Sequence, residues 1–182
     1  MQVLEKTDTS RVSDDRKVSH KPSEELLFRK PSGEDGAQVW ELIKRAGTLD
    51  LNSSYSYIML CEFFPETCVI AEQDNQIVGF VSAFRPPIKE DVIFVWQIAV
   101  DSSQRGKGLG KRLLHELLNR QACQDVRYLE ATISPSNSPS QSLFRSLANS
   151  LDTECEVSEC FPEEYFPGSG HEEELLFRIG PF

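Results

Sequence analysis

The sequence predicts a single domain of the mixed α/β class, and three observations support this. Its 182 residues suffice for one complete hydrophobic core. Helical and strand-like apolar patterns follow one another along residues 25–182 in the order β-α-α-β-β-β-α-β-α-β-β. Neither an internal repeat nor a second domain is visible there. Residues 1–24 are polar and charged with almost no apolar periodicity, so we expect a mobile tail before the domain.

The first part of the domain predicts a strand and a helix. Residues 25–30 contain an apolar run suited to a strand. Ser32 or Asp35 is placed to cap the helix that follows, whose apolar residues recur at helical spacing. Gly47 ends this helix, because glycine readily adopts the left-handed conformation found after helix C-termini. The polar residues 50–55 then form a connection.

A second helix and a hairpin come next. The helix is short, and Pro65 closes it. Strands are expected over 67–72 and 76–85, joined by a tight turn at Asp74 and Asn75.

The second half of the domain predicts strands and helices in alternation. Residues 92–100 form a strongly apolar central strand, and leucines recur at helical spacing over 109–118. Residues 126–133 predict a further strand, and Asn137 is suited to cap the next helix. The last strand is expected over 173–179.

Charge and cysteine content narrow the functional classes. The formal net charge is −10 and the pI is near 4.8, which argues against a nucleic-acid partner. The five cysteines show no CxxC pair, so reduced thiols in the cytoplasm fit better than disulfides or a zinc site. No apolar run approaches the length of a membrane span and no signal peptide is expected. We therefore expect a cytoplasmic protein with no metal and no membrane partner.

A glycine-rich basic stretch, Arg105-Gly106-Lys107-Gly108-Leu109-Gly110, lies between the central strand and a helix start. Glycines let backbone N–H groups crowd onto an anion, and a helix N-terminus adds partial positive charge. Arg105, Lys107 and Lys111 supply further positive charge. The stretch is therefore suited to a pyrophosphate. Its spacing fits neither a nucleotide triphosphatase loop nor a dinucleotide-binding fingerprint.

The spacing instead resembles R/Q-x-x-G-x-G/A, the coenzyme A loop of the GNAT-type N-acetyltransferase superfamily. Arg105, Gly108 and Gly110 occupy its fixed positions, and the Val100-Asp101 element before the loop agrees. The resemblance implies a mixed, mostly antiparallel sheet flanked by helices, with acetyl-CoA as co-substrate. The residues that it assigns to acetyl-CoA are Ile98, Ala99, Val100, Arg105, Gly106, Lys107, Gly108, Leu109, Gly110, Lys111, Asn137 and Phe144.

Longer stretches resemble one family within this superfamily, the L-2,4-diaminobutyrate acetyltransferases. These stretches are residues 47–55, 84–87, 94–97, 129–132 and 177–181. The resemblance implies transfer of acetyl to the 4-amino group of L-2,4-diaminobutyrate, for synthesis of the compatible solute ectoine. It also implies a homodimer, which the apolar terminal strands favour.

Direct attack of an amine on a thioester needs a base for the ammonium proton and a donor for the oxyanion. On this fold the donor is a backbone N–H of Ile98 or Val100. Many GNAT-type enzymes place a tyrosine seven residues after the helix asparagine as an acid for the thiolate. Here that position is Phe144. Tyr55, Tyr57 or solvent would have to protonate the thiolate, unless it leaves unaided.

The acceptor carries two ammonium groups, so carboxylates are expected beside it. Asp50 is the first candidate, with capping of the second helix as its alternative role. Asn52, Ser53 and Tyr55 are candidates for hydrogen bonds to the substrate, although Asn52 or Ser53 is equally suited to cap that helix. Trp96 is a candidate wall of the pocket.

Two further groups complete the catalytic candidates, which are Asp50, Trp96, Glu130 and His171. Glu130 lies in an apolar strand, where a carboxylate needs a partner. It would act as a base through water or pair with Arg127 or Lys107. His171 would take the proton, with a solvated surface histidine as the alternative.

The remaining substrate candidates lie outside this group. Strand alternation predicts that Gln97 points to the face opposite Trp96. Glu156 and Glu159 lie in the acidic segment 151–171, which reads as a loop or as a weak strand plus a loop. They are candidates to bind the α-ammonium, and Arg85 to meet the carboxylate, although a salt bridge at the rim suits Arg85 better.

Two other functions stay open from the residues alone. A GNAT-type enzyme acting on a polyamine, an antibiotic or a protein N-terminus would keep the same coenzyme A loop. So would a non-catalytic acyl-CoA sensor. The polar connection at 50–55, Trp96 and His171 favour catalysis over sensing.

Overall fold

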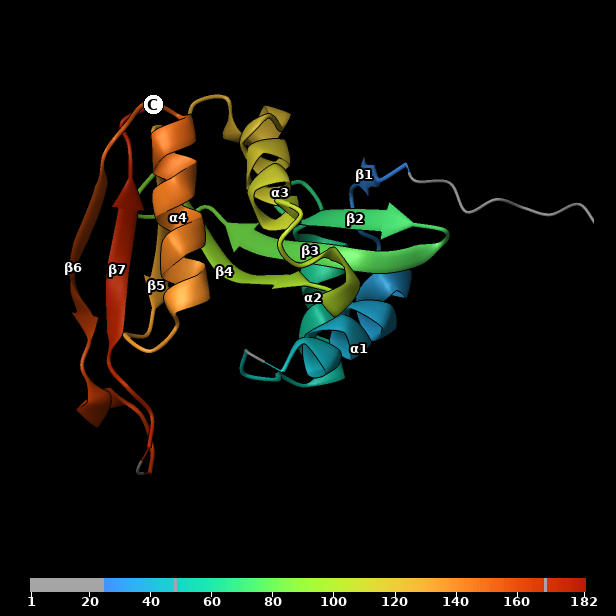
Figure 1. Cartoon of the computed structure of the whole chain (residues 1–182), viewed down its shortest axis with the longest axis horizontal. Coiled ribbons are helices and arrows are strands. Elements are labelled where there is room, and N and C mark those ends of the chain that lie inside the picture. Colours follow the sequence, from blue (N-terminus) through green and yellow to red (C-terminus); the bar gives the residue numbers. More distant parts are fainter. Residues whose placement is uncertain (1–24, 48, 169) are drawn as a thin grey trace, which may run out of the picture.

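The computed structural model describes residues 25–47, 49–168 and 170–182, so the predicted tail over 1–24 lies outside the described residues. One seven-stranded sheet with the order β1-β2-β3-β4-β5-β7-β6 organises this part of the chain (Figure 1). The strands are β1 (Leu27–Arg29), β2 (Val69–Gln73), β3 (Gln76–Phe84), β4 (Val92–Val100), β5 (Tyr128–Ile133), β6 (Cys155–Phe161) and β7 (Glu174–Ile179). The α-helices are α1 (Gly36–Ala46), α2 (Ser54–Phe63), α3 (Leu109–Leu118) and α4 (Ser138–Ser150).

The pairing between β4 and β5 is parallel, whereas the other neighbours in the sheet pair antiparallel. It joins Val92–Phe94 to Tyr128–Glu130 and then stops. Beyond Phe94 and Glu130 the two strands separate, as Figure 1 shows in the middle of the sheet. This fork divides the sheet into a half with β1–β4 and a half with β5–β7.

Two apolar clusters hold the helices to the sheet. One joins α3 and α4 to β2, β3, β4, β5 and β7, and the other joins α1 and α2 to β2, β3 and β4. The clusters form because each of α1 and α3 buries one apolar stripe, which is the pattern of a helix lying on a sheet. Helices α1 and α2 therefore lie under the β1–β4 half, and α4 packs on β6 and β7 (Figure 1).

The local signals in the sequence agree with these elements. The element order is confirmed. Asp74 and Asn75 both have positive φ, as a two-residue hairpin turn requires, and Gly47 ends α1 in the left-handed conformation. The predicted first strand shortens to three residues.

Two segments resolve alternatives that the sequence left open. Ser53 caps α2 by accepting a hydrogen bond from the Ser56 N–H, so neither Asp50 nor Asn52 is the cap. The acidic segment 151–171 takes the second of its predicted forms, because it contains strand β6 followed by a connection to β7.

Candidate functional site

A narrow cleft opens where β4 and β5 part. One side comes from β4 and the other from β5 and the start of α4, while Leu49 closes one end. The lining residues are Leu49, Val95, Trp96, Gln97, Ile98, Ala131, Thr132, Ile133, Asn137, Ser140 and Phe144. Five of them were predicted as site residues: Trp96, Gln97, Ile98, Asn137 and Phe144.

A bulge in β4 shapes this cleft. Ser82 pairs with Gln97 while Ala83 pairs with Val95, so Trp96 is one extra residue opposite β3. Val95 packs in the core under α3 and α4, yet Gln97 bonds toward α2. Alternation is therefore reset at Trp96, and the prediction that Trp96 and Gln97 point to opposite faces is wrong. Both line the cleft, with Trp96 42% exposed.

Backbone direction along β4 identifies the N–H groups that face the fork. The Asp101 N–H donates to the Val78 carbonyl of β3, and the Gln97 N–H donates to the Ser82 hydroxyl of the same strand. Successive N–H groups of a strand point to alternate sides. Those of Ile98 and Val100 therefore point away from β3, toward the side of β5. Of these two residues, Ile98 lines the cleft.

The glycine-rich loop lies between β4 and α3, as predicted. Gly108 is the N-cap of α3 with φ of 76°, a conformation that L side chains rarely adopt, and its α-carbon faces open space. Gly110 has a different role, since a β-carbon there would lie 3.2 Å from Leu143 of α4. Arg105 and Lys107 are exposed, and Arg105 donates to the Ala46 carbonyl at 2.8 Å.

Three other residues predicted to bind acetyl-CoA lie around α4. Asn137 caps this helix by accepting from the Ser140 N–H at 3.2 Å. Phe144 is 2% exposed and packs in the core beside the cleft. Lys111 of α3 donates to Ser146 at 3.3 Å. Among the remaining residues assigned to acetyl-CoA, Ala99 and Leu109 are buried in the core.

A hydrogen-bond chain fixes the connection between α1 and α2. The Gln97 side-chain amide donates to the Asp50 carbonyl at 2.8 Å, and the Tyr57 hydroxyl donates to Gln97 Oε1 at 3.1 Å. The Asn52 N–H in turn donates to Tyr57 at 3.2 Å. Tyr57 is fully buried, whereas Tyr55 is exposed. The bulged strand thus positions the predicted acceptor segment.

His171 meets Asp50 across the mouth of the site. His171 Nε2 lies 3.6 Å from an Asp50 carboxylate oxygen, and Nδ1 donates to the Glu172 carbonyl at 2.7 Å. The ring stacks on Phe166. The Glu172 carbonyl, and less strongly the Asp50 carboxylate, raise the pKa of His171 above its ordinary value. The structure therefore brings two of the four catalytic candidates together.

Glu130 has partners that the sequence analysis did not identify. It is 2% exposed, lies 2.8 Å from Lys89 Nζ, and forms a second ion pair with Arg178. The predicted partners Arg127 and Lys107 were wrong. Lys89 comes from the connection before β4 and Arg178 from β7, so no local spacing in the sequence links them to Glu130.

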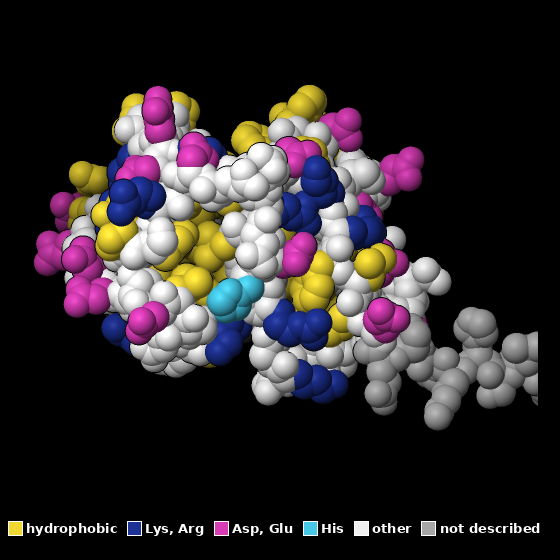
Figure 2. All heavy atoms as spheres, turned by 90° about the horizontal axis from the view of Figure 1, so that it is seen from above, with side chains coloured by type: hydrophobic (Ala, Val, Ile, Leu, Met, Phe, Trp, Pro, Cys, Tyr) yellow, Lys and Arg dark blue, Asp and Glu magenta, His cyan; other side chains and the backbone are white. Residues whose placement is uncertain are grey.

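The two candidate acids of β6, Glu156 and Glu159, do not face the same side of the strand. Glu156 pairs in register with Arg178, whereas Glu159 pairs with Leu175, which packs against the core. Their side chains are exposed on opposite faces of the strand. In Figure 2, Asp and Glu side chains gather at the left edge, where β6 lies in Figure 1. Arg85 is paired with Asp125 at 2.6 Å, as predicted for a salt bridge at the rim.

Sequence reasoning missed Glu174, the first residue of β7. Burial raises the pKa of this half-buried carboxyl, while nearby Thr132, which lines the cleft, acts in the opposite direction. No motif surrounds it in the sequence, so no local signal could have revealed it.

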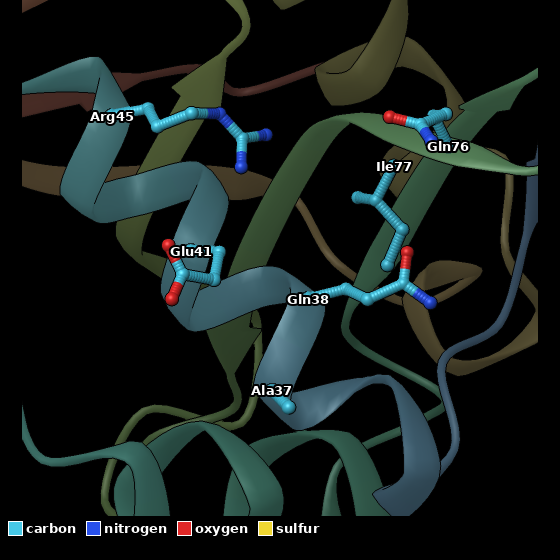
Figure 3. A pocket seen from close by; sticks show the side chains of 6 residues that line it. All are labelled: Ala37, Gln38, Glu41, Arg45, Gln76 and Ile77. Atoms are coloured by element: carbon cyan, nitrogen blue, oxygen red, sulfur yellow. The ribbon is translucent and has the colours of Figure 1, made fainter.

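A larger hollow of about 310 Å³ lies elsewhere, on the outer side of α1. Figure 3 shows its lining residues: Ala37, Gln38, Glu41, Arg45, Gln76 and Ile77. None of them lines the fork. Within the described ranges, no group of three or more His, Cys, Asp or Glu is placed to hold a metal ion, and no helix has the length and apolarity to cross a membrane.

The fork between β4 and β5, followed by a glycine-rich loop at the head of a helix, defines a class of acyl-CoA-dependent transferase. The acetyltransferase (GNAT) family model matches residues 37–148. The chain belongs to the GNAT family of acetyltransferases.

Two relatives within the family share one name. The chain is 62% identical to the L-2,4-diaminobutyric acid acetyltransferase of Marinococcus halophilus, with 86% of this chain and 91% of the relative covered. It is 61% identical to the protein of the same name from Halalkalibacterium halodurans, with 86% and 82% covered.

A solved structure agrees. Diaminobutyrate acetyltransferase EctA from Paenibacillus lautus, in complex with its substrate L-2,4-diaminobutyric acid and coenzyme A, is 47% identical. The TM-score is 0.83, with 86% of this chain and 95% of that chain covered.

Proposed function

We propose that the protein transfers the acetyl group of acetyl-CoA to the 4-amino group of L-2,4-diaminobutyrate. The observation that carries this proposal is the position of Asp50, which contacts both Gln97 in the cleft and His171 at its mouth. The Gln97 amide holds the Asp50 backbone carbonyl, and the exposed Asp50 carboxylate lies 3.6 Å from His171, where a cationic acceptor would approach the thioester. The identity to diaminobutyric acid acetyltransferases supplies the substrate.

The glycine-rich loop would hold the pyrophosphate of acetyl-CoA. The N-terminus of α3 begins at Gly108, and the exposed Arg105 and Lys107 add positive charge beside it. The pantetheine chain would then enter the fork between β4 and β5, past Phe144. The thioester would lie near Ile98, whose N–H is directed to that side.

The reaction forms one bond and breaks one. The neutral 4-amine attacks the thioester carbon, and the oxyanion accepts a hydrogen bond from the Ile98 N–H. The attacking nitrogen then loses a proton to solvent, the C–S bond breaks, and CoA leaves as a thiolate. Phe144 has no proton to give, and the Tyr57 hydroxyl is engaged with Gln97 and Asn52. The thiolate therefore takes a proton from Tyr55, which is exposed, or from solvent, unless it leaves unaided.

His171 is the base that the geometry favours. It is neutral above its raised pKa and can then accept the proton of the ammonium group. Glu130 is a weaker candidate, because two cations already occupy its carboxylate. Trp96 would form the wall of the acceptor pocket or stack on an ammonium group.

We further propose that the product, N4-acetyl-L-2,4-diaminobutyrate, serves ectoine synthesis and osmoprotection in the cytoplasm. The cysteines within the described part of the chain are free thiols, which suits a reducing compartment. We also propose a homodimer, since β6 is an edge strand with exposed Val157 and Phe161. Gel filtration showing only monomer at micromolar concentration would rule the dimer out.

The decisive experiment is thiol release from acetyl-CoA with L-2,4-diaminobutyrate, ornithine, lysine, spermidine and a peptide. We expect strong turnover with diaminobutyrate, and NMR of the product should show acetyl on the 4-amino nitrogen. Preference for another amine would contradict the proposed substrate. Tight CoA binding without turnover of any amine would instead identify a sensor.

A further inference from the structure

We propose that Lys89 and Arg178 form a carboxylate-binding subsite that makes the enzyme select an amino acid over a simple diamine. This inference rests on the proposed function and extends it. A diaminobutyrate acceptor has one carboxylate, and the proposed catalytic groups deal only with its amines. The sequence analysis considered Arg85 for the carboxylate, but Arg85 is bound to Asp125 on the rim.

The charge of this cluster is not balanced internally. Glu130 supplies one negative charge, buried at 2% exposure, and Lys89 and Arg178 supply two positive charges. The two cationic side chains remain 44% and 29% exposed. Lysine has three N–H donors and arginine five, so donors remain after both have paired with Glu130. These three residues therefore carry a net charge of +1 with donors that a ligand can reach, and the acid nearest in register, Glu156 on β6, is exposed.

Arg178 is also fixed in place. Its guanidinium lies 3.7 Å from the centre of the Tyr128 ring. Glu130 holds it from the neighbouring strand, because the two residues are paired in register. A guanidinium held on two sides presents its remaining donors in one direction, which is what recognition of a carboxylate requires.

The cluster lies at the base of the fork. Glu130 is opposite Phe94 in the last β4–β5 pair, and Thr132, two residues further along the same face of β5, lines the cleft. Two residues of strand span about 6–7 Å, which is comparable to the length of a four-carbon diamino acid.

The opposite end of the site carries the complementary charge. Glu174 lies near Thr132 of the cleft, and Asp50 lies beside His171. A substrate with its carboxylate at Lys89 and Arg178 would place its amino groups toward these acids. The distribution of charge along the site thus matches one carboxylate followed by two ammonium groups.

The test compares two acceptors that differ only in the carboxylate: L-2,4-diaminobutyrate and 1,3-diaminopropane. We expect the wild-type enzyme to prefer diaminobutyrate in kcat/KM. The variant Lys89→Met should raise KM for diaminobutyrate roughly tenfold, the loss expected for one hydrogen-bonded ion pair, with KM for diaminopropane changing less than about twofold. Arg178 stays to neutralise Glu130 in this variant.

A second variant and a control sharpen the result. Arg178→Lys keeps the charge but removes the planar donor pair, so the preference for diaminobutyrate should fall. In the control variant Lys30→Met, the preference should stay at the wild-type value. Lys30 is exposed and pairs with Glu66 far from the fork, which makes it a matched loss of one lysine.

The outcomes separate the two proposals. Equal rises in KM for both acceptors in Lys89→Met and Arg178→Lys would show that the cations only support Glu130, and would overturn the subsite. A wild-type enzyme that does not distinguish the two acceptors would overturn it as well. Failure of the wild type to acetylate diaminobutyrate, with turnover of another amine, would instead refute the proposed function.

Discussion

At the scale of the residue, His171 shows how the site controls a proton. Both of its ring nitrogens have partners, Glu172 on one side and Asp50 on the other. Each partner favours the protonated ring, and together they raise the pKa of His171 above its ordinary 6.5. The contacts that position the ring therefore also raise its pKa.

The pH dependence of the reaction should reveal this arrangement. Because the pKa of His171 is raised, the stabilisation from its charged contact with Asp50 is fully present below pH 6.5. It is lost as the pH rises through the pKa of His171 in the folded protein. A base must be neutral, so kcat should fall as the pH drops through that same value. We expect Asp50→Asn to lower the pKa of His171 and move this limb to lower pH, although the Glu172 contact remains.

NMR titration of the His171 ring and the pH profile of kcat at saturating amine check this prediction together. His171→Gln should abolish the fall in kcat at low pH. His115 of α3, whose ring bonds the Ser150 hydroxyl of α4, provides an internal reference signal. A limb that stays in place in both variants would show that His171 is not the base.

Several site residues could be predicted from the sequence, and others could not. The glycine-rich loop is local, so its spacing reveals it. Asp50 and His171 were candidates because the reaction needs a carboxylate near the substrate amines and a base for the proton. The partners of Glu130 come from two distant segments, and Glu174 has no motif around it. Such contacts depend on strand register, which the sequence does not specify at the level of single residues.

At the scale of the element, the bulge in β4 links the coenzyme side of the cleft to the acceptor side. It turns Gln97 toward Tyr57 and Asp50, while Ile98 keeps its N–H toward the fork. A bulge adds one residue to a strand without any strong sequence signal. The extent of β4 was predicted correctly, but the predicted alternation of Trp96 and Gln97 was wrong because the bulge was not foreseen.

The α1–α2 connection should depend on the Tyr57 hydroxyl. Tyr57→Phe removes the acceptor of the Asn52 N–H and the donor to Gln97, both in a buried setting. We expect a loss of about 1–3 kcal/mol in the free energy of unfolding. We also expect KM for the amine to rise roughly threefold to tenfold, because Asp50 loses its fixed position.

Steady-state kinetics and thermal denaturation test this change. KM for acetyl-CoA should stay near the wild-type value, since the Tyr57 hydroxyl bonds to Asn52 and Gln97 and not to the glycine-rich loop. Tyr165→Phe removes an exposed hydroxyl and serves as the control. Equal increases in both KM values would mean that the hydrogen-bond chain supports the whole cleft rather than the acceptor segment.

At the scale of the whole molecule, the short β4–β5 ladder is the backbone connection between the two half-sheets. Three residue pairs join two half-sheets there, and the strands then part. The element order was predictable because each amphipathic pattern is local. The point where the ladder stops was not, because it depends on the pairing of strands with a helix between them.

A ligand that fills the fork would contact both half-sheets and so stabilise the molecule as a unit. CoA at a hundredfold excess over its Kd should add about 3 kcal/mol to the free energy of unfolding. For a chain of this size that corresponds to a rise in Tm of roughly 5–10 °C. Hydrogen exchange should show the largest new protection at the Ile98 and Val100 amides, which point to the open side of β4.

The variant Gly108→Glu makes this measurement specific. It places bulk and negative charge where the phosphate would lie, and its positive φ adds a small strain to the free protein. The rise in Tm on adding CoA should therefore disappear, whereas Gln121→Glu, which adds the same charge at an exposed site, should keep it. A rise that survives in Gly108→Glu would mean that CoA binds elsewhere. If CoA did not raise the Tm of the wild-type protein, CoA would not join the two half-sheets by binding in the fork.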